Sequence, residues 1–361
     1  MKIRPRTGSR VARDKSRQKY PSLSRFARDL LIHWRRLQLP GSDVTAIIAV
    51  SGGADSVALL LALDELVKAK KLEIEIIVAH VDHRLRKASA DDARWVKDLA
   101  RRLGYEFSIS RINLRNHQVN LEQAARAARY KVFAALAQKR RANIVLTAHT
   151  MDDQAETILL NLIRGSGAEG LSGIEAVRPL KKGSKTFLVR PLVSWARRQN
   201  TEQFCRELGI DFRSDEMNED ETFARVRVRQ QLLPLMETFN PRIVDAITRT
   251  GELLRDDSDA LNAAAERLLE LSIENGEKGN QLRIDLLATS GAALRRRTLR
   301  LWLAGCRGDL RRLELVHIRA VESLITENRG ARAIELPGGS TVTRKRELLR
   351  FNRRTLGKPE A

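Results

Sequence analysis

The stretch TAIIAVSGGADS, residues 45–56, decides the fold of this chain. Its first half, TAIIAV, is short, apolar and rich in β-branched residues, which predicts a buried strand of a parallel sheet. Its second half, SGGADS, joins that strand to an apolar helix over 57–68. The glycines let the loop amides point inward at a helix start, and Ser51 and Ser56 add hydroxyl donors. No Gly-Lys-Ser/Thr follows, so this is no Walker A loop, and the alternative to a phosphate-binding turn is an ordinary strand-to-helix turn.

Strands and helices alternate beyond this loop. Each expected strand is a short apolar run, and each expected helix shows a helical period, with Gly104 and Gly165 as stop signals. This alternation predicts an α/β fold with a doubly wound parallel sheet. The further strands are expected over 72–80, 106–112 and 142–149, and the helices over 57–68, 89–103, 121–140 and 152–165.

The chain divides into four regions by composition and period. Residues 1–40 are a basic extension that we predict to be disordered. Residues 41–230 hold the α/β domain, where Ser194 is expected to cap a helix. Residues 231–330 are helical by period and predict a separate domain. Residues 331–361 alternate around a Pro-Gly-Gly turn, which predicts a terminal β-hairpin with a basic tail.

The charge balance predicts a polyanionic partner. Lys and Arg number 66 against 45 acids, a formal charge of +21. Aromatic residues make up only 4%, so phosphate contacts by Arg are expected to dominate over base stacking. The two cysteines, Cys205 and Cys306, exclude a disulfide scaffold and a CxxC motif, which favours a cytoplasmic setting. The apolar run 57–63 is far too short to span a membrane, so no membrane partner is expected.

Two further polar motifs follow expected strands. HVDHRLR (80–86) ends the second strand and AHTMDDQAET (148–157) the fourth, so both are expected in one crevice with SGGADS, because ligands of such sheets bind beyond the carboxyl ends of the strands. Within the latter motif Asp152, Asp153 and Glu156 share a helix face. Helix capping by the acids and core positions for His80 and His149 are the alternatives. A zinc site of His80, His83 and His149 lacks a completing cysteine, so Mg²⁺ with ATP is preferred.

These motifs together carry a family resemblance. SGGxDS resembles the pyrophosphate loop of the N-type ATP pyrophosphatases, and the full set resembles the tRNA(Ile)-lysidine synthase family. The matching patterns are SGGxDS, HxDHxLR, AHxxDDQxET, Arg164-Gly165, Arg190-Pro191-Leu192, and an acidic segment with Asp215 and Asn218 before Arg225, Arg227 and Arg229. Val226 departs from the family, which commonly has Asn there. The resemblance is strong over about 45–235, weak over 236–330 and returns at Leu336–Gly339, and we expect the chain to lack the second C-terminal domain of longer members.

The resemblance implies a reaction and a set of site residues. AMP is transferred to the C2 oxygen of the wobble cytidine (position 34) of the CAU-anticodon isoleucine tRNA, pyrophosphate leaves, and free lysine displaces AMP to form lysidine, which changes codon reading from AUG to AUA. Cofactors would be ATP and Mg²⁺, with Asp55 and Asp153 as metal ligands. The pyrophosphate contacts would be Ser51, Gly52, Gly53, Ala54, Asp55 and Ser56, and the catalytic or substrate-binding residues His83, Arg129, His149, Asp153, Glu156, Arg225 and Arg229.

We expect tRNA phosphates to meet arginines outside the crevice, although an Arg-rich helix face can also be merely solvated. Three rivals stay open: a PP-loop tRNA thiolase, a GMP- or NAD-synthetase-like enzyme, and a basic RNA-binding protein with a vestigial ATP site. The thiolase would need paired thiols, and the amide synthetase has no use for the high charge. Oligomeric state is left open, a homodimer included. The expected tRNA contacts are Arg227, Arg295, Arg296, Arg297, Arg300, Arg311 and Arg312.

Overall fold

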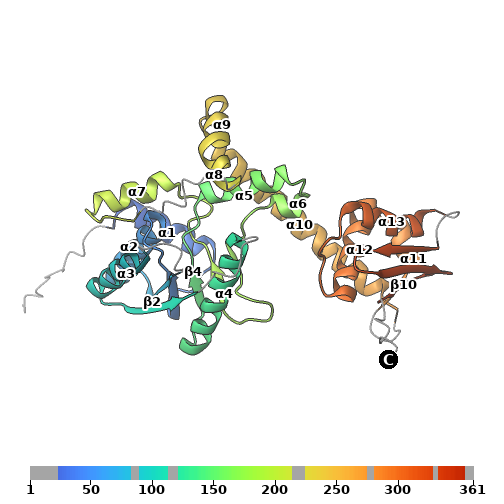
Figure 1. Cartoon of the computed structure of the whole chain (residues 1–361), viewed down its shortest axis with the longest axis horizontal. Coiled ribbons are helices and arrows are strands. Elements are labelled where there is room, and N and C mark those ends of the chain that lie inside the picture. Colours follow the sequence, from blue (N-terminus) through green and yellow to red (C-terminus); the bar gives the residue numbers. More distant parts are fainter. Residues whose placement is uncertain are drawn as a thin grey trace, which may run out of the picture. The chain divides into compact units, whose positions relative to one another are not determined.

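The computed structural model describes residues 23–82, 89–112, 121–213, 224–274, 280–327 and 332–353. The chain forms two compact units (Figure 1). The first holds the residues up to Arg164 and Gly173–Thr248, and the second holds Gly165–Ser172 and the residues from Arg249 onward. Across the described residues, no helix combines the length and the apolar character needed to cross a membrane.

The first unit is built on a six-stranded sheet of order β3-β2-β1-β4-β6-β5. Strands β1 to β4 and β6 pair in parallel, and only β5 runs antiparallel, at the edge beside β6. The predicted doubly wound α/β class is therefore confirmed, with an antiparallel edge strand added. The strands are β1 (Ser42–Ala49), β2 (Glu73–Asp82), β3 (Glu106–Arg111), β4 (Ile144–Leu146), β5 (Val177–Pro179) and β6 (Phe187–Val189).

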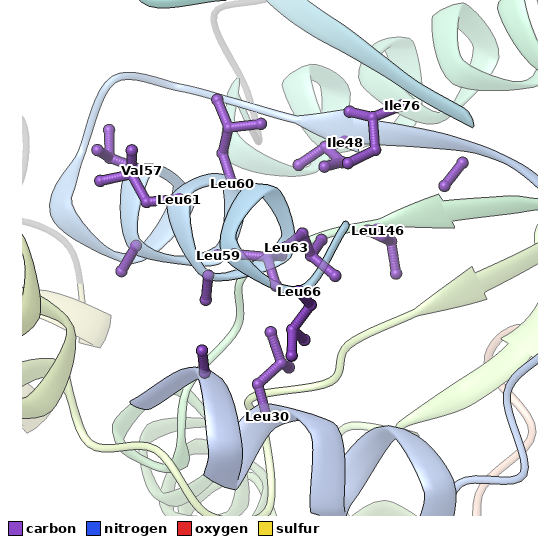
Figure 2. Close-up of a cluster of buried hydrophobic side chains, with 14 of the residues drawn as sticks. Leu30, Ile48, Val57, Leu59, Leu60, Leu61, Leu63, Leu66, Ile76 and Leu146 are labelled. Atoms are coloured by element: carbon purple, nitrogen blue, oxygen red, sulfur yellow. The ribbon is translucent and has the colours of Figure 1, made fainter. Parts of the chain in front are cut away.

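Helices cover both faces of this sheet because alternate strand residues point to opposite sides. On one face Ile48 and Leu146 join a core with helix α2, and on the other Ile47 and Val145 pack with Phe133 of helix α4. Figure 2 shows α2 between the strands that carry Ile48 and Ile76 and the helix that carries Leu30. The helices are α1 (Arg25–Arg36), α2 (Ala54–Lys68), α3 (Ser89–Leu103), α4 (Leu121–Arg140), α5 (Met151–Ile163) and α7 (Arg198–Glu207).

Two local predictions need correction. Helix α1 lies inside the extension predicted to be disordered, and it is ordered because Leu30 and Trp34 are fully buried against the α2 core. Its N-cap is Ser24, whose hydroxyl accepts the Ala27 N–H at 3.1 Å. Ser194 does not cap α7, which starts four residues later with Arg197 at the N-cap position.

Short helices and one long helix follow the acidic segment. Helix α8 (Ala224–Arg227), the π-helical turn η2 (Val228–Leu232) and α9 (Leu233–Phe239) lead into α10 (Ile243–Ser272). The boundary between the units falls inside α10, after Thr248, whereas the sequence placed it at residue 230. The reason is packing, since Val244 at the start of α10 is buried with Met151 and Ala155 of α5 in the first unit.

The second unit combines helices with a four-stranded antiparallel sheet of order β7-β10-β9-β8. The expected Pro-Gly-Gly turn joins β8 to β9, with Gly338 and Gly339 at φ 90° and 77°. The hairpin is thus one part of a larger sheet that shares a core with the helices, through residues such as Val342 and Trp302. The elements are α6 (Ala168–Leu171), β7 (Gln281–Arg283), α11 (Ile284–Thr289), α12 (Ala292–Arg307), α13 (Leu315–Thr326), β8 (Ala333–Leu336), β9 (Ser340–Lys345) and β10 (Leu348–Asn352).

Candidate active site

The SGGADS loop is held in shape by its own serines. Ser56 Oγ accepts the Ser51 N–H at 3.1 Å and donates to the Gly53 carbonyl at 2.9 Å. Ser51 Oγ accepts the Gly53 N–H at 3.3 Å. Gly52 has φ 102°, a conformation that a side chain would strain. The loop is therefore pre-shaped between β1 and the first turn of α2, where backbone amides and the helix dipole favour an anion.

Asp55 lies in the first turn of α2 and accepts a hydrogen bond from the buried hydroxyl of Thr201. Burial, together with the negative charge of Asp153, raises the pKa of Asp55 to about 7. Arg198 Nε lies 3.8 Å from Asp55 Oδ2 and offsets only part of this effect. Two carboxylates that repel each other beside a phosphate loop fit a divalent cation, because Mg²⁺ takes one or two carboxylates plus phosphate oxygens.

Glu156 anchors two arginines of the downstream motif to α5. Its side chain is fully buried, and its oxygens accept from Arg225 Nε at 2.7 Å and from Arg229 Nε at 2.7 Å. Arg225 Nη2 also donates to Asp153 Oδ1 at 3.0 Å. Burial by itself would raise the pKa of Asp153, but Arg225 and its neighbouring positive groups hold it at about 2. The structure thus brings together two pairs of residues from two motifs far apart in the sequence, Asp153 with Glu156 and Arg225 with Arg229, and places them beside Asp55.

Arg198 completes this cluster and was missed by the sequence reasoning. Its Nη2 lies 3.6 Å from Asp153 Oδ1 and 3.5 Å from Glu156 Oε1. Its backbone N–H donates to Asp152 Oδ2 at 2.7 Å, while Arg197 Nε donates to Asp152 Oδ1 at 3.0 Å. Arg197 at the N-cap and Arg198 at the first helical position place two positive charges at the positive end of the helix dipole, and this unusual pattern could have marked them in the sequence.

The histidines have distinct environments. His80 is buried and its Nδ1 lies 2.8 Å from the Val50 carbonyl, which suits a residue that supports the loop strand. His149 Nδ1 lies 3.0 Å from Thr147 Oγ1. Burial lowers the pKa of His149 to about 3, so the ring is neutral near pH 7. The residues described hold no group of three or more His, Cys, Asp or Glu placed for a metal ion, and His83 lies outside them.

Helix capping, the alternative raised for these acids, is present at α5 alongside these contacts. Asp153 Oδ2 accepts the Thr150 N–H at 2.9 Å. Asp153 therefore both caps its helix and faces Arg225 and Arg198, so the capping alternative and the site role coexist in one side chain. Asp215 and Asn218 lie outside the described residues.

Comparison with known proteins agrees with this geometry. A family model described as "PP-loop domain" matches residues 29–236, and one described as "TilS substrate binding domain" matches 282–350. A curated tRNA(Ile)-lysidine synthase of Nostoc sp. is 37% identical, over 81% of this chain and 87% of that protein. The chain belongs to the tRNA(Ile)-lysidine synthase family. Similar synthases are those of Nocardia farcinica (38% identity, 85% of this chain and 90% of that protein) and Geobacter sulfurreducens (37%, 87% and 66%).

The solved structures support the thiolase alternative only at the level of the fold. A solved structure, "U34-tRNA thiolase NcsA from Methanococcus maripaludis with its [4Fe-4S] cluster", matches with a TM-score of 0.52 at 17% identity, over 64% of this chain and 80% of that chain. At this identity the likeness describes the sheet and its helices, whereas the three relatives compared above by sequence are lysidine synthases.

Several arginines expected to meet tRNA are engaged within the lysidine synthase fold. In the second unit Arg295 Nε and Arg296 Nε donate to Glu322 at 2.9 and 2.6 Å, and Arg295 Nη1 donates to the Ser290 carbonyl at 2.8 Å. Arg297 Nη1 donates to Glu169 Oε2 at 2.9 Å, with Arg300 Nε 3.7 Å from the same oxygen. The exposed members of the predicted set are Arg227, Arg311 and Arg312, and Arg129 lies half-buried on α4.

Proposed function

We propose that this chain ligates free lysine to C2 of the wobble cytidine of the CAU-anticodon isoleucine tRNA, with ATP as the activating substrate. The observation that carries the proposal is the pre-shaped SGGADS loop with Asp55, Asp153 and Arg198 gathered beside it. Membership of the family supports the same reaction. The C-terminal match to a substrate-binding model and the charge of +21 support tRNA as the partner.

The loop supplies the first chemical step. Its inward amides and the Ser51 and Ser56 hydroxyls would hold the β- and γ-phosphates, so that the α-phosphate faces the base. Mg²⁺, held by Asp55 and Asp153, would neutralise phosphate charge. Arg198 would add a guanidinium to the negative charge that develops as AMP passes to the cytidine C2 oxygen and pyrophosphate leaves.

The acids of α5 would serve the second step, in which the lysine ε-amine attacks C2 and AMP leaves. Asp153 keeps 15% of its side chain exposed and stays ionised, so it is suited to hold a cationic substrate. Glu156 has no exposed surface and accepts from Arg225 and Arg229, so we assign it the positioning of those two arginines. His149, neutral and half-buried, would contact the base by hydrogen bonding.

The proposed setting is cytoplasmic. Cys205, which is buried, and Cys306, which is half-buried, each carry a thiol rather than a disulfide, as expected in a reducing compartment where tRNA is modified.

A single assay tests the reaction. The purified chain is incubated with the tRNA transcript, ATP and lysine, and the nucleosides are analysed by mass after digestion. The expected result is a cytidine that carries a lysyl increment, dependent on both ATP and lysine. Absence of that nucleoside, with tRNA and ATP both bound, would reject the proposal.

A further inference from the structure

Three arginines surround one tyrosine next to the active site. Arg126 and Tyr130 lie on α4, Arg178 lies in the edge strand β5, and Arg190 follows β6. The guanidinium carbons of Arg126 and Arg178 lie 5.5 and 5.3 Å from the centre of the Tyr130 ring. Arg190 Nη2 lies 3.4 Å from the Tyr130 hydroxyl. The ring thus holds three positive side chains in one small region.

These charges are not balanced by acids. Among the residues that the structure describes, Arg126, Arg178 and Arg190 form no ion pair with any carboxylate. Arg190 is only 1% exposed; its Nη1 donates to the Glu175 carbonyl at 2.6 Å, and its Nε is buried without a hydrogen-bond partner. A buried guanidinium with two like charges beside it is costly unless an anion completes the group. Arg197, Arg198 and Arg225, in contrast, each face a carboxylate of α5.

The sheet places this arginine cluster next to the active-site crevice. Strands β4 and β6 are parallel neighbours with Leu146 opposite Val189, so Arg190 and His149 both lie just beyond the same edge. The positive charges of Arg190 and Arg126 contribute to the lowered pKa of His149, which agrees with this closeness. Arg126 is exposed and Arg178 half-buried, so an anion can reach the cluster from the surface of α4.

We propose that Arg126, Arg178 and Arg190 form a second anion site, which binds a backbone phosphate of the RNA whose base enters the crevice. This inference rests on the proposed function. The anion is a phosphodiester rather than a nucleotide phosphate because the ATP loop leads into α2, and α2 and α4 pack on opposite faces of the sheet. Tyr130 acts as the platform that spaces the guanidinium groups.

The test replaces the two accessible members, Arg126→Gln with Arg178→Gln, and leaves the buried Arg190 in place. The matched control is Arg101→Gln with Arg102→Gln, two exposed arginines on α3 that remove the same charge. The dissociation constant for the tRNA transcript is measured between 50 and 200 mM salt. We expect the slope of log K against log salt to flatten by about 0.7–0.9, the value for one phosphate, in the α4–β5 variant, and the control to keep the wild-type slope. ATP affinity without tRNA and the melting temperature should stay unchanged.

Three results would overturn the site. A slope like that of the wild type would mean that no phosphate binds there. Lost ATP affinity with unchanged tRNA binding would assign the anion to the nucleotide. Equal flattening in the control would reduce the effect to diffuse charge. Lysidine formation is measured in a separate assay. If the variants show the expected salt slopes of tRNA binding but the wild-type chain forms no lysidine, the proposed function is rejected while the anion site is retained.

Discussion

Glu156 in the first unit and Glu322 in the second form the same motif in different surroundings. Each is buried on a helix and accepts from two arginines at 2.6–2.9 Å. Around Glu322 the charges and hydrogen bonds are satisfied within the protein. Arg295 also donates to the Ser290 carbonyl. Burial would raise the pKa of Glu322, but the hydrogen bonds from Arg296 and Arg295 outweigh burial and hold the pKa below its usual value. Around Glu156 the negative charges are not fully balanced. Burial and the charge of Asp153 raise the pKa of the neighbouring Asp55 to about 7.

This difference in surroundings distinguishes an ion-pair cluster that stabilises the fold, at Glu322, from one that is prepared to bind ligands, at Glu156. An arginine pair whose partners all belong to its own unit, such as Glu322 and the Ser290 carbonyl, stabilises the fold. A pair that lies beside repelling carboxylates and a phosphate loop is prepared to meet a substrate. The number of arginines alone does not distinguish the two regions.

The largest expected effect comes from Asp55→Asn. It removes the carboxylate that faces the loop, so lysidine formation should fall by at least about 10³-fold, since metal-assisted charge stabilisation contributes several kcal/mol. Product is measured by nucleoside mass analysis, with melting temperature as the control. Wild-type turnover in this variant at saturating tRNA would contradict the role of Asp55.

The variants Glu156→Gln and Glu322→Gln test whether the two glutamates have different roles. Both leave two half-buried arginines without their buried carboxylate, and because solvent screens part of the lost interaction, the cost should lie below the roughly 3–5 kcal/mol of a fully buried pair. We expect Glu156→Gln to abolish activity even at temperatures where it stays folded, because Arg225 and Arg229 lose their anchor. Glu322→Gln should lower the unfolding free energy yet keep kcat and the KM for ATP under conditions where it is folded. If both variants lost activity in proportion to their unfolding, the two motifs would be equivalent.

The two regions should also respond oppositely to pH. The folded-state pKa of Asp55 is raised above its unfolded value, so its contribution favours folding at low pH and is lost as pH rises from about 4 to 7. The pKa of Glu322 is lowered, so its contribution is present above its unfolded pKa and is lost as pH falls.

Urea unfolding of Asp55→Asn and wild type at pH 5 and pH 8 measures the first of these effects. The variant should gain up to about 3 kcal/mol relative to wild type over that interval, from about two pH units below the folded-state pKa at about 1.36 kcal/mol each. A constant difference between the two chains would show that Asp55 carries no stored repulsion.

The smallest expected effect concerns the exposed arginines of the second unit. Arg311→Gln with Arg312→Gln should flatten the salt dependence of tRNA binding by up to about 0.7–0.9 for each phosphate that is no longer neutralised, at unchanged ATP affinity. Arg295→Gln should instead lower stability and leave the slope nearly unchanged, since its guanidinium is committed to Glu322 and Ser290. A flattened slope in a fully folded Arg295→Gln protein would return this residue to the tRNA surface.

The loop, the strands of the sheet and the acids of α5 could be predicted from the sequence because the signal for each lies within one short stretch of residues. The glycines of SGGADS and the spacing of Asp153 and Glu156 can be read locally. The contact of Arg198 with Asp55 spans 143 positions and depends on how α7 packs on α2, which no period reports. Likewise, a run of arginines at 295–297 looks alike whether it faces solvent or a buried glutamate such as Glu322. The ordering of α1 depends on a core that the rest of the chain supplies.

The path of the chain between the units limits how the protein can be dissected. Gly165–Ser172 belongs to the second unit, although the residues on either side belong to the first. Within that segment Glu169 is the partner of Arg297 and Arg300, which lie more than a hundred residues downstream. The second unit is therefore compact in space but discontinuous in sequence. A transplant of this unit must carry the short segment with it, and a chain shortened at residue 248 would keep the segment but lose Arg297 and Arg300, the partners of Glu169.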